Sequence, residues 1–271
     1  MKYDLSNWPE VNLDQIRLSF REVPLAAYPE LKGYSRSNIH EGLAGQGGLF
    51  LASDMAKLLG LRNGMRVLDL GCGAGTTAIY LARTYGVHVD AVDMNVPEAL
   101  NQRAVSLGIG HLVSSTSADC TQLPFAEGYF DAVFSMNAFF YFGTGPAYPS
   151  YLLKFLKSDG ELVIGSPCYA VELSEDSPEE FLLEYPACLK VHSPGWWRDH
   201  FAKHSTVLHS ALHPLGALFW EDRVRFLLEN ENPRVMSPGK REMVYAMIRM
   251  LNRDTDGFVS HFILHAKKAG K

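Results

Sequence analysis

Three closely spaced glycines are the residues of this chain best suited to holding a ligand. Gly71, Gly73 and Gly75 follow an apolar run at residues 66–70, and a helical pattern starts after them, from Ala74 onward. A turn without side chains lets the backbone touch a ligand. The start of a helix directs unpaired N–H groups, and the positive end of its dipole, to the same place. We therefore expect a pocket for a nucleotide-type ligand at this loop.

Two carboxylates narrow the choice of nucleotide. Asp69 stands two residues before the first glycine, and Asp93 ends a second apolar run, at residues 87–93, about where a ribose-binding acid is expected. A carboxylate there can accept hydrogen bonds from both ribose hydroxyls and would repel a 2′-phosphate, which disfavours NADP. The dehydrogenase pattern G-x-G-x-x-G also needs a glycine at the position of Thr76. An NAD-linked oxidoreductase is therefore the weaker alternative.

With an aspartate before it, the loop resembles motif I of the class I S-adenosylmethionine (SAM) dependent methyltransferases. The resemblance continues along the chain: Asp93 matches the ribose acid of the family and Asp119 its acid on the adenine side. Residues 123–135 look like the fourth strand with its usual lead-in, and residues 157–164 like the glycine turn into the fifth strand. These matches cover residues 47–166 in the expected order, so they are more specific than a glycine loop alone.

The resemblance implies that SAM is the cofactor and S-adenosylhomocysteine the product. The residues it implies for the cofactor site are the glycine loop, the acids after the strands with their neighbours, and a tyrosine from an N-terminal segment that in related enzymes often folds over the cofactor. They are Asp69, Gly71, Cys72, Gly73, Gly75, Asp93, Met94, Asp119, Cys120, Ser135 and Tyr34.

The expected chemistry is an in-line displacement of the methyl group from the sulfonium to a nucleophile. Orienting the two reactants can by itself contribute ~7–11 kcal/mol, so no catalytic residue is obligatory and we assign none. Phe140 and Tyr141, after the fourth strand, could favour the sulfonium through a cation–π contact of ~0.5–2 kcal/mol. Together with His192 they are the candidate residues of the substrate pocket. No Asn-Pro-Pro-Tyr type sequence follows that strand, which argues against methylation of amino groups on nucleic-acid bases.

The periodicity predicts an α/β fold: a Rossmann-like, doubly wound, mostly parallel seven-stranded sheet with N-terminal helices and a helical cap insertion. Alternation of strands and helices along the chain implies a parallel sheet covered on both faces. The expected strands lie near residues 66–70, 87–92, 112–115, 130–135, 160–165, 205–210 and 258–267, and the expected helices near residues 12–21, 47–59, 74–85, 96–107, 147–156, 216–230 and 238–252, with an aromatic helix around Trp196 and Trp197.

Three parts of the chain are expected to have different tasks. Residues 1–46 form an N-terminal helical segment covering the cofactor site, and residues 47–168 form the SAM-binding core. Residues 169–271 hold the remaining strands and a helical substrate cap at about 211–257, where the family has a closing β-hairpin. A cap beside the carboxyl edge of the sheet would shape a substrate cavity.

Composition excludes several other classes of protein. The net charge of −5 over 271 residues gives no general attraction to nucleic acid. The four cysteines show no C-x-x-C pair and no metal-ligand spacing with histidine, so we expect no metal site and a reduced, cytoplasmic protein. We also find no apolar run long enough to span a bilayer and no signal-peptide pattern at the N-terminus, so no membrane partner is expected.

The leading interpretation is a small-molecule methyltransferase resembling the type 11 or ubiquinone-biosynthesis-like group, with a capped and partly aromatic pocket. A non-catalytic SAM sensor or scaffold protein is the alternative, and an NAD-linked oxidoreductase is less favoured. The acidic run from Glu172 to Glu184 could attract a cationic amine or simply form a solvated face. The sequence leaves open the acceptor, its reacting atom (oxygen, nitrogen, carbon or sulfur) and the oligomeric state.

Overall fold

The structure is a computed structural model that describes residues 20–43, 45–96, 98–174, 190–232, 234–254 and 257–269. The helix expected at residues 12–21 lies almost wholly outside this part, and residues 20 and 21 within it are not helical. The acidic run that begins at Glu172 lies outside it beyond residue 174. In the N-terminal segment, two short 3₁₀ turns at Leu25–Ala27 and Pro29–Leu31 precede helix α1, Arg36–His40.

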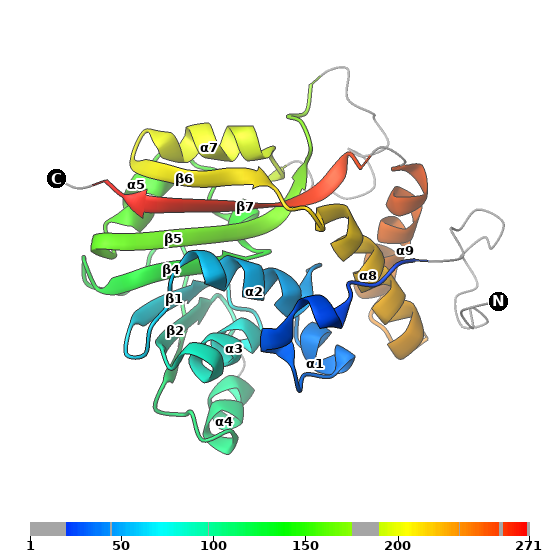
Figure 1. Ribbon diagram of the computed structural model, residues 1–271, viewed down its shortest axis with the longest axis horizontal. Helices are drawn as coiled ribbons and strands as arrows, with labels where there is room; N and C mark the ends of the chain where they lie inside the picture. Colours follow the sequence, from blue (N-terminus) through cyan, green and yellow to red (C-terminus); the bar gives the residue numbers. More distant parts are fainter. Residues whose placement is uncertain are drawn as a thin grey trace.

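The core of the molecule is a seven-stranded sheet in the order β3-β2-β1-β4-β5-β7-β6 (Figure 1). All neighbouring strands pair in parallel except β7, which runs antiparallel between β5 and β6. This confirms the expected doubly wound, mostly parallel sheet. The strands are β1 Arg66–Leu70, β2 His88–Asp93, β3 Val113–Ser117, β4 Phe130–Met136, β5 Leu156–Tyr169, β6 Ser205–Leu212 and β7 Val259–Lys268.

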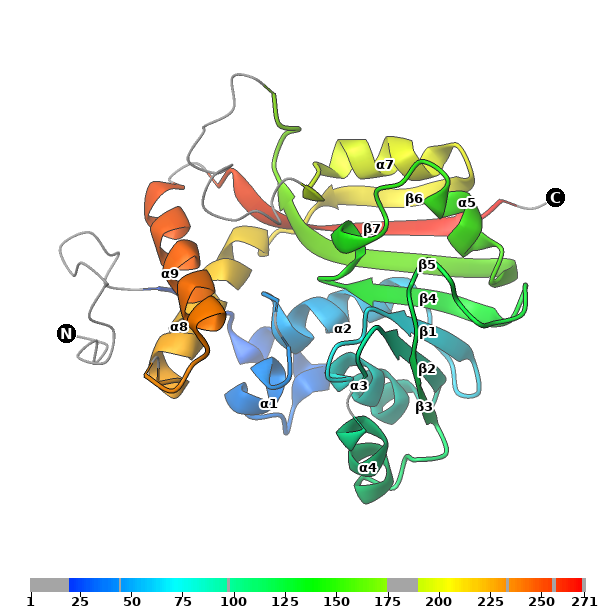
Figure 2. The ribbon, with the colours of Figure 1, turned by 180° about the vertical axis from the view of Figure 1, so that it is seen from behind.

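Helices cover both faces of the sheet, and each face has its own apolar core. Because side chains alternate along a strand, Val67 of β1 packs into one core while Leu68 and Leu70 pack into the other. Helices α2, α3 and α4 lie on one side and α5 and α7 on the other (Figures 1 and 2). Their bounds are α2 Gly48–Leu58, α3 Thr76–Tyr85, α4 Ala99–Ser106, α5 Tyr148–Leu153 and α7 Pro194–Ala202.

The boundaries around the fifth strand differ from their predicted positions. The helix expected to reach residue 156 ends at Leu153, and β5 begins at Leu156 rather than at residue 160. The Phe155 carbonyl already accepts hydrogen bonds from the N–H groups of Tyr129 and Phe130 at the start of β4. Pairing with the neighbouring strand therefore extends the chain here, where the local apolar pattern alone favoured a helix.

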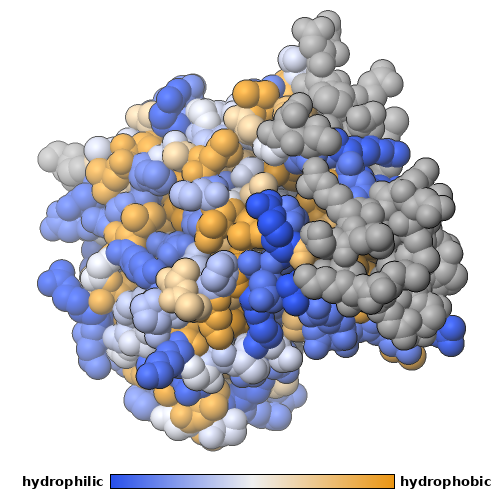
Figure 3. Space-filling model, turned by 45° about the vertical axis from the view of Figure 1, so that its right-hand side comes forward, coloured by the Kyte–Doolittle hydropathy of each residue, from blue (hydrophilic) through white to orange (hydrophobic). Residues whose placement is uncertain are grey.

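Two further helices, α8 Gly216–Asn230 and α9 Pro238–Arg253, lie between β6 and β7, as the sequence predicted. They pack together beside α1, at the end of the sheet where the parallel strands finish (Figures 1 and 2). Ser237 caps α9 by accepting a hydrogen bond from the Lys240 N–H. No helix in the described ranges combines the length and the apolar character that crossing a bilayer requires. On the side shown in Figure 3, hydrophilic and apolar residues are interspersed.

A buried carboxylate connects α8 to the N-terminal segment. Asp222, 2% exposed, accepts hydrogen bonds from the Val23 N–H at 2.8 Å and from the Arg36 guanidinium at 2.7 Å. The Nε2 atom of His40, also buried, lies 2.9 Å from its second oxygen. Removing one partner of a buried ion pair leaves the other charge uncompensated, which costs several times more than breaking an exposed pair.

We expect Asp222→Ala to lower the free energy of unfolding by ~3 kcal/mol or more, because the buried Val23 N–H would lose its partner and Arg36 would be left with Glu22 and the Val23 carbonyl. The matched control is Glu229→Ala, on the same helix, whose ion pair with Arg225 is solvent-exposed on the glutamate side and should cost under ~0.5 kcal/mol. Urea unfolding measures both. Equal losses in the two variants would contradict this account of the α8 contact.

Candidate functional site

The glycine loop joins β1 to α3, and all three of its glycines have positive φ angles, 76° at Gly71, 53° at Gly73 and 77° at Gly75. A Cβ on Gly71 would lie 2.3 Å from the Cβ of Ala138, and one on Gly75 would lie 2.3 Å from the Leu100 side chain. These two glycines therefore permit close packing. A Cβ on Gly73 would meet nothing within 4 Å, so this residue presents bare backbone to open space.

Asp93, the last residue of β2, holds the loop with one oxygen. Its Oδ2 accepts a hydrogen bond from the Gly73 N–H at 2.9 Å. Its Oδ1 has no hydrogen-bond partner among the described residues and can accept from a ligand. The Gly71 and Cys72 N–H groups donate to the Val92 carbonyl at 2.8 and 3.0 Å, so the loop is attached to the end of β2 at several points.

Asp69 lies inside the protein, in β1, and its role is different. Its Oδ2 accepts a hydrogen bond from the Thr77 hydroxyl in the first turn of α3. Burial raises the pKa of Asp69 to about 7, and the nearby charge of Asp93 adds to the effect. Asp69 does not line the cavity at the loop. It fixes the start of α3, and with it the position of Gly75, which caps that helix in a left-handed conformation.

A cavity of about 320 Å³, which we call the loop cavity, opens in front of the glycine loop. Gly42, Leu43 and Gly45 of the N-terminal segment form one wall, and the ends of β2 and β4 form others. Thr77, Met136, Ala138 and Phe142 also contact it. Of the residues predicted from the sequence, it brings together Gly71, Cys72, Gly73, Asp93, Met94, Cys120 and Tyr141.

A second cavity of about 150 Å³, the cap cavity, lies between the sheet and helices α8 and α9. It shares three lining residues with the loop cavity, Gly45, Asn137 and Tyr141, so the two adjoin. Its other lining residues come from β5, β7, the cap helices and their neighbours: Gln46, Phe140, Pro167, Cys168, Tyr169, Val191, Trp220, Met243 and Val259.

Asn137, directly after β4, stands at the junction of the two cavities. It has a left-handed backbone with φ 56°, a conformation that asparagine tolerates better than most residues. Its Nδ2 donates to the Gln46 carbonyl at 2.8 Å, which leaves Oδ1 to accept from the Nε2 of His261 at 3.2 Å. Burial lowers the pKa of His261 to about 3, so the ring is neutral and its Nε2 carries the proton. Gly45 permits this arrangement, because a Cβ there would lie 2.4 Å from the Nδ2 of Asn137.

Sequence reasoning did not identify Asn137 or residues 42–46 as parts of a site. The segment that contains Asn137 was considered only because it lacks an Asn-Pro-Pro-Tyr type sequence. Its position immediately after a buried strand, ahead of four consecutive aromatic residues, was the available signal. Gly42 and Gly45 were the only conspicuous residues of that segment, and nothing local indicated that Gly45 and Gln46 reach the end of β4.

Two predicted cofactor residues lie elsewhere. Tyr34 is not at the loop cavity: it lines a separate cavity of about 440 Å³, beside Tyr80 and Arg83 of α3. Asp119 is exposed and accepts hydrogen bonds at 2.8 Å from the N–H and the hydroxyl of Thr121. Its carboxylate therefore closes its own turn, and only its neighbour Cys120 lines the loop cavity.

Two other predicted residues have structural contacts instead of a place on either cavity. Ser135 is buried in β4, and its hydroxyl donates to the Leu70 carbonyl at 2.7 Å. His192 stacks on Trp196 with 3.7 Å between ring centroids, and its Nδ1 lies 2.7 Å from Glu172. Phe140, by contrast, lines the cap cavity.

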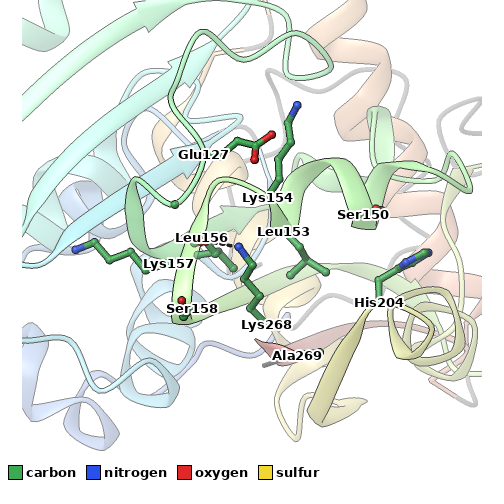
Figure 4. Close-up of a pocket in the computed structure, with 11 residues that line it drawn as sticks. Glu127, Ser150, Leu153, Lys154, Leu156, Lys157, Ser158, His204, Lys268 and Ala269 are labelled. Atoms are coloured by element: carbon green, nitrogen blue, oxygen red, sulfur yellow. Dashed lines mark hydrogen bonds between the residues drawn. The ribbon is translucent and has the colours of Figure 1, made fainter. Parts of the chain in front are cut away.

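A larger cavity of about 690 Å³ lies at the opposite end of the sheet, where β5 begins and β7 ends (Figure 4). Three lysines line it, but each already has a neighbour: Lys157 pairs with Asp131, Lys268 donates to the Leu156 carbonyl, and Lys154 lies over aromatic rings. It is separate from the glycine loop. Within the described part of the chain, no group of three or more His, Cys, Asp or Glu side chains is placed to hold a metal ion.

Comparison with known proteins identifies the central region. A family model described as "Methyltransferase domain" matches residues 67–160. The phosphoethanolamine N-methyltransferase 1 of Triticum aestivum is 32% identical over 128 residues, which is 47% of this chain and 26% of that protein. The chain thus spans about a quarter of the length of this curated relative.

Solved structures extend the likeness in fold beyond that region. The phosphoethanolamine N-methyltransferase 2 of Haemonchus contortus, solved with SAM, has a TM-score of 0.69 at 18% identity, covering 91% of this chain and 60% of that one. The geranyl diphosphate C-methyltransferase of Streptomyces coelicolor A3(2) has a TM-score of 0.62 at 20% identity, covering 82% of this chain and 80% of that one. At residues 67–160 the chain therefore carries a methyltransferase domain of the class I, SAM-dependent family.

Proposed function

We propose that this protein transfers a methyl group from SAM to a small-molecule acceptor. The loop cavity binds SAM, and the cap cavity binds the acceptor. The observation that carries the proposal is that the two cavities meet at Gly45, Asn137 and Tyr141, directly beside the glycine loop. In this proposal residues 47–168 are the SAM-binding core, and residues at about 211–257 are the cap that shapes the acceptor cavity.

The loop cavity fits the adenosyl part of SAM in three respects. Gly73 presents backbone without a side chain, and the free Oδ1 of Asp93 can accept hydrogen bonds from ribose hydroxyls. Met94, next along the chain and 69% exposed, offers an apolar surface to a base. Tyr141 and Phe142 line the same cavity and can favour a sulfonium by ~0.5–2 kcal/mol.

Bound SAM would supply a methyl group on a sulfonium. A nucleophile of the acceptor would form a bond to the methyl carbon, in line with the carbon–sulfur bond, while that bond breaks, its electrons stay on sulfur and S-adenosylhomocysteine leaves. The residues of this chain hold the two reactants in line and keep water out, and orientation of that kind can contribute ~7–11 kcal/mol. We assign no general base. A sensor that only bound SAM would need the loop cavity alone, so the adjoining cap cavity favours a transferase. Two relatives are named for small-molecule acceptors, phosphoethanolamine and geranyl diphosphate, which supports an acceptor of that size class.

Incubation with SAM and a pooled metabolite extract tests the proposed activity directly. We expect S-adenosylhomocysteine to be released only when protein, SAM and extract are all present, and the melting temperature to rise with SAM and S-adenosylhomocysteine. Stabilisation by NAD alone would contradict the proposal, and tight SAM binding with no turnover on any acceptor would favour a sensor.

We expect Asp93→Ala to weaken binding of S-adenosylhomocysteine by roughly 1.5–3 kcal/mol for each charge-assisted hydrogen bond lost to the ribose. Isothermal titration calorimetry measures the change, and the melting temperature checks that the variant is folded. The control is Tyr34→Phe, which should keep its affinity because Tyr34 lies at a separate cavity. Unchanged affinity of the Asp93 variant would remove this residue from the site.

The raised pKa of Asp69 predicts a pH effect on the ligand-free protein. The folded state keeps a proton that the unfolded chain releases near its ordinary pKa of about 4. The stabilising contribution is therefore complete below that value and is lost as the pH rises through about 7. Asp69→Asn imitates the neutral acid, so we expect its unfolding free energy to fall less than that of the wild type between about pH 5 and about pH 8.

Asp131→Asn is the control for this pH effect. Burial alone would raise the pKa of Asp131, but hydrogen bonds from Lys157 and from the Arg66 N–H lower it. Its titration thus lies below the tested range, and the slope of stability against pH should match that of the wild type. An Asp69→Asn slope equal to the wild-type slope would show that Asp69 is ionised in the folded protein.

A further inference from the structure

We propose that the acceptor bound by the cap cavity is an uncharged molecule about the size of a single six-membered ring. This inference rests on the function proposed above and specifies its substrate. Such an acceptor differs from phosphoethanolamine and geranyl diphosphate, for which two relatives are named, because both of those molecules carry phosphate groups.

The charge of the residues that line the cap cavity constrains the charge of the acceptor. None of the described residues that line the cap cavity is an acid or a base. Its polar groups are the amides of Gln46 and Asn137, the tyrosine hydroxyls and the Cys168 thiol. Burial raises the pKa of Cys168, so this thiol is neutral as well. An ionised acceptor would therefore find no counter-charge among these lining residues.

The arginine of α8 that follows the lining residue Trp220 most closely in the sequence makes hydrogen bonds to groups outside the cap cavity. Arg223 follows Trp220 by three residues, but its guanidinium donates to the His40 carbonyl at 3.2 Å and to the Leu43 carbonyl at 2.8 Å. Both carbonyls belong to the N-terminal segment. This cation therefore holds a backbone loop and does not line the acceptor cavity.

The free-energy cost of removing an ion from water disfavours a charged acceptor. Moving an ion out of water into a site without a partner costs several kcal/mol. A neutral hydrogen bond returns only ~0.5–1.5 kcal/mol, so the amides cannot compensate for a carboxylate or phosphate. For a cation, contact with the rings of Phe140, Tyr169 or Trp220 returns ~0.5–2 kcal/mol, which is also too little. An uncharged acceptor avoids these costs.

The size and the polarity gradient of the cavity specify the rest. Its volume is about 150 Å³, and a dry apolar cavity of roughly 150 Å³ in another protein accommodates one benzene molecule. Asn137 and Tyr141 lie at the boundary with the loop cavity, whereas Cys168, Val191 and Met243 line only the cap cavity. The nucleophilic atom of the acceptor thus points to Asn137 and Tyr141, and its apolar part lies among the other three.

Matched pairs of ring compounds test the inference on protein saturated with S-adenosylhomocysteine. The pairs are phenol with 4-hydroxybenzoate, aniline with 4-aminobenzoate, and benzyl alcohol with the cation of benzylamine. Ligand-observed NMR titration measures their affinities, with phosphoethanolamine as an added charged probe. We expect the uncharged member of each pair to bind at least about tenfold more tightly, a difference of ~1.4 kcal/mol. Equal or tighter binding of the charged members, or no binding of any ring, would overturn the inference.

Met243→Arg tests the electrostatic cause. Met243 is half-buried on α9 and lines the cavity, so an arginine there should reverse the preference within the two carboxylate pairs. The control is Met250→Arg, half-buried two turns further along the same helix and away from the cavity, which should leave the preference unchanged. The wild-type comparison does not depend on either variant folding.

Calorimetry with S-adenosylhomocysteine on the same samples distinguishes a failure of the proposed acceptor class from a failure of the proposed function. Binding of S-adenosylhomocysteine together with a preference for charged rings would overturn the acceptor class and leave the methyltransferase proposal intact. Failure of S-adenosylhomocysteine to bind the wild-type protein would overturn the proposed function, and the inference with it.

Discussion

The side chain of Asn137 makes the contact on which the geometry of both cavities depends. Its amide nitrogen donates to the carbonyl of Gln46, and its amide oxygen accepts from the ring of His261. Three segments distant in the sequence are thereby joined at one residue: the end of β4, the N-terminal loop and β7. Because both ends of a primary amide are used, the side chain has one orientation. The boundary at which the loop cavity and the cap cavity meet is built around it.

Gly42, Leu43 and Gly45 of the N-terminal segment line the loop cavity, whereas Tyr34 lines a separate one. Arg223 of α8 binds the carbonyls of His40 and Leu43, while Asp222 binds the Arg36 side chain and the Val23 N–H. Helix α8 and the part of the N-terminal segment that ends at Leu43 are therefore attached to each other by polar contacts. A shift of α8 would change the walls of both cavities together, which suits a site where two reactants must be aligned.

The electrostatic character of the two cavities differs in the way the proposed reaction requires. Asp93 gives the loop cavity a carboxylate that can bind ribose hydroxyls and lies on the side where a cationic cofactor is proposed to bind. The described lining of the cap cavity carries no formal charge. A methyl acceptor would thus be selected by shape and by neutral hydrogen bonds, while the charged partner stays in the cavity that has the acid.

The sequence by itself determined the sheet, most helix positions, the cap helices and the glycine loop with Asp93 after the next strand. These features depend on patterns among residues close together in the chain: apolar periodicity, glycines that must adopt positive φ, and acids at strand ends. Only the tertiary structure decided which residues meet in space. It placed Asn137 at the junction, joined the Ser135 hydroxyl to the Leu70 carbonyl, and put Tyr34 at a separate cavity. The hydrogen bonds that the Ser135 and Asn137 side chains donate join residues 65 and 91 positions apart in the sequence, and no local pattern records them.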